Sequence, residues 1–114
     1  MATVRVFAHT GVTTAPVAPG AGRYTTDSIP LMKQPYLARE TITPDVSTAV
    51  STAAATAPNK TALFNVQIET GKRVAIEVNP QNRSVVATAD SPQYTGNVTF
   101  EAGPEWSLSM LEIA

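Results

Sequence analysis

The pattern of residues 63–78 constrains the fold of this chain more than any other feature. Apolar side chains alternate with polar or small ones on both sides of Gly71, and turning the chain back at that glycine sets the apolar residues opposite one another. An antiparallel pair of strands places such an alternation on one face, which is buried while the other meets water. We therefore predict a β-hairpin over residues 63–78. Its expected pairs are Ile68 with Val74, Val66 with Ile76, and Phe64 with Val78.

The composition favours strands and loops over helices. Thr and Ala are abundant, and nine prolines are spread over only 114 residues, which is the length of one domain with a single modest core. Large anchoring side chains are few, with one Trp, three Phe and three Tyr. The core must therefore be built mainly from Val, Ile, Leu and Ala.

Charge and cysteine content exclude several classes of function. A net charge of −1 argues against a nucleic-acid or anionic-membrane partner, because both attract a basic excess. The absence of cysteine excludes disulfides, thiolate metal sites and a cysteine nucleophile. No stretch approaches the roughly 20 apolar residues of a membrane span, and the first residues lack the apolar run of a signal peptide. We expect a soluble protein made in the cytoplasm of its host.

Charge is unevenly distributed along the chain. Residues 1–83 hold eight basic and five acidic residues, which gives +3, whereas residues 84–114 hold four acidic residues and no basic one, which gives −4. The two segments either neutralise each other within one molecule or provide complementarity to a neighbouring copy or a partner surface. The sequence leaves both interpretations open.

Short alternating segments separated by turn-forming residues predict further strands. They lie at residues 3–8, 23–26, 38–43, 61–69, 73–78, 84–89, 97–102 and 106–113. In the last two, the inward side chains are Val98, Phe100 and Ala102, and then Trp106, Leu108 and Met110. Leu111 and Ile113 fall out of this phase, which indicates a bulge or a strand buried on both faces. We predict an all-β fold, a small antiparallel β-sandwich or jelly-roll-like domain.

The N-terminal half is less regular. Residues 1–60 combine a first strand with a Pro/Ala/Thr-rich arm and linker, and residues 61–114 form the antiparallel core of what is one structural domain. Residues 43–45, Thr-Pro-Asp, are typical of a helix start, so residues 46–57 form a short helix or an irregular linker, with a strand also possible. About fifty residues is small for a β-core. The remainder comes from the first strand, from the apolar segment 29–37 or from other molecules.

The sequence offers no constellation of catalytic or metal-ligating residues. His9 is the only histidine, and no Asp, Glu or Cys stands near it at ligand spacing. Glu69 and Glu77 fall on the polar face of the predicted hairpin, and the glycines are isolated rather than gathered in a phosphate-binding loop. We therefore expect a protein that is not an enzyme and that holds no metal or cofactor.

Apolar side chains interleaved with basic ones in residues 23–39 form an interaction strip or cover the open end of the core. With one residue of the first strand they make up our predicted partner interface. Its residues are Phe7, Tyr24, Leu31, Met32, Tyr36 and Leu37.

The C-terminal half carries a distinctive order of small motifs. They are Ala57-Pro58-x-x-Thr61, Leu63, Val66, Ile68-Glu69, Gly71, Glu77-Val78-Asn79-Pro80, Arg83, Ser91-Pro92, Gly96, Phe100, Gly103-Pro104-x-Trp106 and Glu112. This order resembles that of small virion proteins of tailed bacteriophages, the capsid decoration (cement) proteins. The resemblance covers the C-terminal half and no catalytic motif.

The resemblance implies a β-rich structural protein that binds the outer surface of a phage head in many copies. It implies the major capsid protein as partner and a homotrimer as the favoured oligomer. A carbohydrate- or receptor-binding module of a fibre or spike is the alternative, and exposed Trp106 and Tyr94 side by side would favour it. Another head or tail component is a second alternative, and an enzyme a remote third.

Overall fold

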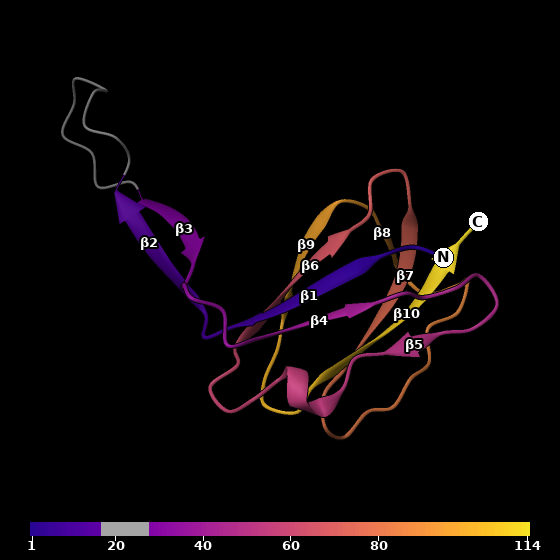
Figure 1. The fold of residues 1–114 in the computed structure, drawn as a ribbon. Helices are drawn as coiled ribbons and strands as arrows, with labels where there is room; N and C mark the ends of the chain where they lie inside the picture. The colour runs from indigo at the N-terminus through magenta and orange to yellow at the C-terminus, as the bar shows by residue number, and fades with distance from the viewer. Residues whose placement is uncertain (17–27) are drawn as a thin grey trace.

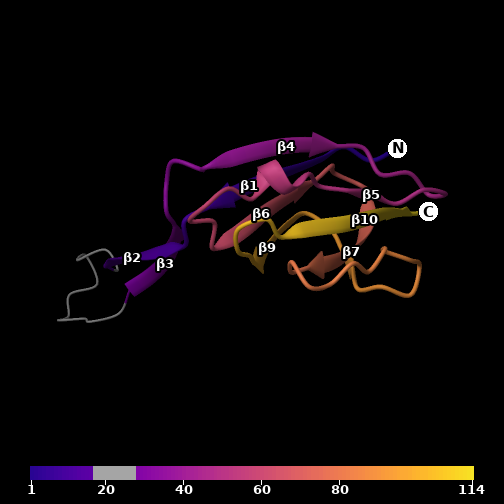
Figure 2. The same cartoon turned by 90° about the horizontal axis from the view of Figure 1, so that it is seen from below.

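Two antiparallel four-stranded sheets pack face to face in the computed structural model, which describes residues 1–16 and 28–114 (Figures 1 and 2). The first sheet has the strand order β4-β1-β6-β9 and the second β5-β10-β7-β8, while β2 and β3 form a separate two-stranded hairpin. The strands are β1 (Val4–His9), β2 (Val12–Pro16), β3 (Ser28–Met32), β4 (Ala38–Ile42), β5 (Val50–Ser51), β6 (Leu63–Ile68), β7 (Arg73–Asn79), β8 (Gln93–Tyr94), β9 (Asn97–Glu101) and β10 (Ser107–Ile113). The predicted all-β sandwich is confirmed. The predicted strand at residues 23–26 lies outside the described residues.

The predicted hairpin over residues 63–78 is wrong in its pairing. β6 pairs with β1 and β9, whereas β7 pairs with β10 and β8, so the two strands belong to different sheets. The turn itself is present: Lys72 N–H donates to Glu69 C=O at 3.1 Å, and Gly71 has a φ of 84°. The period of two correctly places Val66 and Ile76 in the core, but Asn65 and Ala75, predicted on the face that meets water, are buried as well. It does not distinguish a partner along a hydrogen-bonded ladder from one across the core.

The core lies between the two sheets and is closed within the chain. β1 stands inside the first sheet, between β4 and β6, so two of that sheet's four strands come from the N-terminal half. Phe100 and Trp106 pack against the core at its border. The buried apolar residues that form the central cluster of the core are Ala2, Val4, Val6, Ala8, Ile42, Ala57, Phe64, Val66, Ile68, Val74, Ile76, Ala102, Leu108 and Met110.

The segment between β4 and β6 is mostly irregular. It contains the two-residue β5 and a single 3₁₀ turn, η2 (Ala54–Thr56), and no helix begins at Pro44, contrary to the helix-start signal. Glu40 of β4 instead accepts hydrogen bonds from the Ala53 N–H at 2.9 Å and the Thr56 hydroxyl at 2.5 Å. The carboxylate thus satisfies one backbone N–H and one side-chain hydroxyl of this segment. The segment thereby joins the edge of the first sheet to the second.

The strand predicted at residues 84–89 is absent. The side chain of Asn79 accepts a hydrogen bond from the Val85 N–H at 3.0 Å and donates one to the Val85 C=O at 2.9 Å. The Ser109 hydroxyl accepts from the Ala87 N–H at 2.9 Å. Polar side chains thus replace a strand ladder, and they hold this loop against the outer side of the second sheet.

The last strand is buried on both of its faces. β10 pairs with β7 in an unbroken register from Ser107 to Ile113, which excludes the bulge considered from the sequence. Leu108 and Met110 face the core, and Ser109 on the other face is covered by the loop that contains Ala87. Leu111 and Ile113, on the same face as Ser109, are partly buried.

Candidate functional site

The β2–β3 hairpin extends from one end of the sandwich as an arm (Figures 1 and 2). Its strands pair from Val12 opposite Met32 to Pro16 opposite Ser28. At its root, Lys33 N–H donates to the Gly11 C=O at 2.8 Å, and the His9 ring nitrogen Nδ1 donates to the Lys33 C=O at 2.9 Å. His9 is only 3% exposed. The single histidine therefore fastens the arm to β1.

Three of the predicted interface residues are large apolar side chains exposed on this arm or just after it. Leu31 on β3 is 47% exposed, and Tyr36 and Leu37, between β3 and β4, are 40% and 38% exposed. Phe7 is half-buried in the first sheet and meets Tyr36 edge to face, with ring centroids 5.1 Å apart. Met32 lies in β3, although its side chain is not described, and Tyr24 lies outside the described residues.

Within residues 23–39, Leu31, Tyr36 and Leu37 keep more than a third of their surface exposed, and Tyr36 also covers part of Phe7. Val12 on β2 is a further exposed apolar residue, at 56%, which the sequence analysis missed because it stands in a Thr-, Pro- and Gly-rich segment. We call Val12, Leu31, Tyr36 and Leu37 the arm residues.

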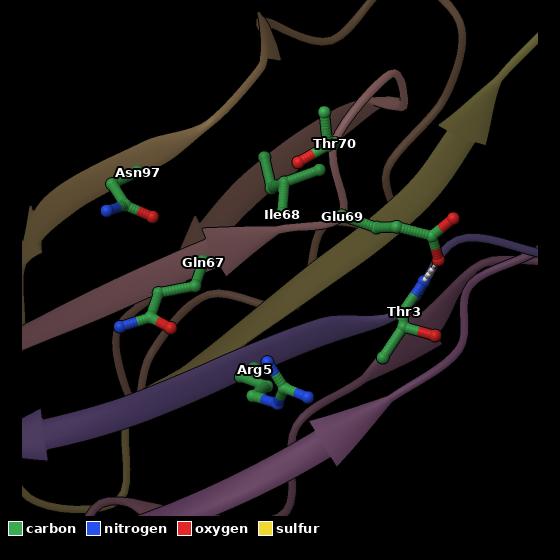
Figure 3. Close-up of a pocket in the computed structure, with 7 residues that line it drawn as sticks. All are labelled: Thr3, Arg5, Gln67, Ile68, Glu69, Thr70 and Asn97. Atoms are coloured by element: carbon green, nitrogen blue, oxygen red, sulfur yellow. Dashed lines mark hydrogen bonds between the residues drawn. The ribbon is translucent and has the colours of Figure 1, made fainter.

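A polar depression lies on the outer face of the first sheet (Figure 3). Its volume is about 470 Å³, and most of its lining surface is polar. The register sets Arg5 of β1, Gln67 of β6 and Asn97 of β9 side by side across three strands. The other lining residues are Thr3, Ile68, Glu69 and Thr70. Sequence reasoning missed this row because it requires the pairing of β6 with β1 and β9.

A second polar cluster, on the second sheet, is structural. Glu77 accepts hydrogen bonds from the Ser91 hydroxyl at 2.6 Å and from Arg83 Nη2 at 2.9 Å. The Ser91 hydrogen bond lowers the pKa of the Glu77 carboxyl below its ordinary 4.5; partial desolvation opposes this shift, and Arg83 reinforces it. Both partners lie in the loop after β7. Glu77 therefore ties this loop to its strand.

The aromatic pair that would favour a carbohydrate-binding module is not exposed. Tyr94 and Trp106 are both partly buried against the core, and Tyr94 packs edge to face with Phe100 at 5.1 Å between ring centroids. A Cβ atom on Gly103 would lie 2.7 Å from Nε1 of Trp106, so this ring is held close to the backbone.

The uneven charge is neutralised within the molecule at one place among the described residues. The Glu112 carboxylate lies 3.6 Å from the Met1 ammonium and 3.9 Å from that of Lys72. Asp90, Glu101 and Glu105 form no ion pair in the part of the chain that the structure describes. Most of the acidic excess of residues 84–114 therefore stays open to solvent or to a partner.

Comparisons with protein-family models, with curated proteins and with solved structures found no match to this chain. Within residues 1–16 and 28–114, no three or more His, Cys, Asp or Glu side chains gather in a way that could hold a metal ion. The same residues include no helix long and apolar enough to cross a membrane.

Proposed function

We propose that this protein is a structural virion component that decorates and stabilises a tailed-phage capsid by binding its outer surface in many copies. Its partner is the major capsid protein, and its role is mechanical rather than enzymatic. The resemblance of its C-terminal half to decoration proteins suggests this role. The observation that carries it is the arm, a β-hairpin that leaves the sandwich and exposes large apolar side chains.

An isolated two-stranded hairpin is only marginally stable in water. The β2 and β3 strands pair with each other and with no other strand of residues 1–16 and 28–114, and Leu31 and Val12 remain open to solvent. Such a segment gains stability when it lies against a second surface, because its apolar side chains then leave water. A capsid provides that surface at every symmetric position.

Binding to an assembled shell stabilises the shell by mass action. A protein that binds the assembled capsid but not its separated subunits shifts the equilibrium toward assembly at each occupied site. Two contacts per molecule, one through the sandwich and one through the arm, raise the effective affinity further. The arm therefore acts as a clamp between neighbouring subunits.

The test uses virions stripped of the protein and rebuilt with the wild type or with a variant. The arm variant carries Leu31→Asp and Tyr36→Asp, and the control carries Val86→Asp, which alters an apolar residue that is 64% exposed in the loop after β7. We expect wild type and control to restore survival of heating and osmotic shock, and the arm variant to bind poorly. Unchanged survival of stripped virions would contradict the proposal.

The oligomeric state follows from the same proposal. We expect a homotrimer, which suits threefold or quasi-threefold positions on an icosahedral head. An electron-microscopy map of the rebuilt virion locates the bound density and its local symmetry. Density at fivefold vertices or along the tail would favour a different head or tail component.

A further inference from the structure

The polar depression on the first sheet is lined by no described residue of the arm. Arg5, Gln67 and Asn97 stand on neighbouring strands at the same level of the sheet. Arg5 and Asn97 are exposed, and Arg5 forms no ion pair with any described residue. In Figure 3 the two amides lie at one end of the depression, Thr3 and Glu69 lie at the other, and Arg5 lies between them.

The depression is shaped by the sheet and by two side-chain hydrogen bonds. Glu69 Oε1 accepts from the Thr3 N–H at 3.0 Å, which holds the carboxylate at the end of β6 beside β1. Gln67 donates from Nε2 to the Asn65 side chain at 3.3 Å, so its carbonyl oxygen stays available. Strand-borne side chains are positioned more rigidly than those of loops. The side chains of Glu69 and Gln67 are therefore held in place before any ligand arrives.

The chemistry of these groups selects a class of ligand. A guanidinium provides donors, a carboxylate provides acceptors, and amide and hydroxyl groups provide both. The +1 charge of Arg5 and the −1 charge of Glu69 cancel, which disfavours a strongly anionic ligand and equally a cation. Ile68 is the only apolar residue that lines the depression, so an apolar ligand or peptide side chain finds little surface.

We infer that this depression binds a neutral saccharide. Neighbouring sugar hydroxyls both donate and accept hydrogen bonds, which matches a row that runs from amides through a guanidinium to a carboxylate. A volume of about 470 Å³ falls within the range of small-ligand sites and holds one or two sugar rings. The site lies on a different face from the Trp106 and Tyr94 pair and does not depend on it.

Two variants with a matched control test the site. Arg5→Gln and Asn97→Ala change exposed residues that line the depression, whereas Arg39→Gln changes an exposed arginine of the same sheet, on β4, that does not line it. The purified full chain is applied to an array of neutral and acidic oligosaccharides from bacterial surfaces and mucins. The best ligand is then titrated by calorimetry. Thermal unfolding of each variant confirms that the fold is intact.

We expect a neutral oligosaccharide to bind, with affinity reduced at least roughly tenfold by Arg5→Gln and by Asn97→Ala and unchanged by Arg39→Gln. No binding at millimolar saccharide, or binding that both site variants retain, would overturn the inference. So would binding only to sulfated polymers such as dextran sulfate that disappears with added salt, because that is the behaviour of charge alone. Since the isolated protein is used, the result does not depend on capsid binding.

Discussion

The sandwich and the arm are built from the same kind of strand, but they differ in what covers their side chains. In the sandwich, each sheet buries its apolar face against the other, and Phe64, Val66, Leu108 and Met110 are fully removed from water. In the arm, the two strands have only each other, and Leu31 stays half exposed. The comparison teaches that strand propensity is common to both regions, whereas stability comes from the second layer.

The largest expected effect breaks the sandwich and leaves the arm unchanged. Phe64→Ala empties the centre of the core, where the ring is fully buried, and we expect it to reduce the free energy of unfolding by about 3–5 kcal/mol. Leu31→Ala also truncates a large apolar side chain, but on the exposed arm, and should cost within about 0.5 kcal/mol. Urea denaturation of both variants measures the difference. Comparable losses would show that the arm is part of the folded core.

A smaller effect concerns how the loop after β7 is attached to the sandwich. Asn79→Ala removes both hydrogen bonds to Val85 at a site where the side chain is 6% exposed, so we expect a loss of about 2 kcal/mol. Asn82→Ala, at an exposed position in the same loop, is the matched control and should change stability little. Hydrogen exchange at the Val85 amide should rise in the first variant alone. Equal exchange in both would exclude Asn79 as the anchor.

The sequence identified most of the core-facing side chains of β6 and β7, but it did not identify the strands' partners or the burial of Asn65 and Ala75. The alternation over residues 63–78 correctly assigned Phe64, Val66 and Ile76 to the core, because burial repeats with a period of two. The predicted pairing was wrong because a hairpin within one sheet and a turn that joins two sheets produce the same alternation of apolar and polar residues. The strand predicted at residues 84–89 is absent for another reason. A strand pattern was present, but the Asn79 side chain satisfies that backbone locally.

The two candidate sites also differ in how far the sequence alone indicates them. Leu31, Tyr36 and Leu37 could be found from the sequence because large apolar residues in a proline-rich segment are unusual, and their exposure agrees with an arm that meets a partner. Arg5, Gln67 and Asn97 are ordinary polar residues far apart in the sequence. Only the strand order β1-β6-β9 places them together, and no local spacing could have indicated it.

Acid should weaken the contact between Glu77 and the loop after β7 before it affects the core. Folding lowers the pKa of Glu77, so its stabilisation is complete above the unfolded value of about 4.5 and is lost as pH falls through the folded value. We expect the difference in unfolding free energy between wild type and Glu77→Gln to shrink from about pH 5 to pH 3. Denaturant titrations at several pH values measure it, with Glu101→Gln as an exposed control on β9. A difference that stays constant with pH would show that the Glu77 charge does not stabilise the fold.

The smallest expected effect on stability comes from removing the whole arm. Gly11 and Lys33 are joined by a backbone hydrogen bond of 2.8 Å, so residues 12–32 can be replaced by a two-residue Gly-Ser turn that keeps the His9 contact to Lys33. Because the arm strands pair only with each other, we expect the free energy of unfolding to change by no more than about 0.5 kcal/mol. Calorimetric unfolding of the excised protein checks this. A loss of several kcal/mol would mean that the arm stabilises the sandwich directly. If the protein instead keeps its stability but no longer binds capsids, the arm serves only to bind the partner.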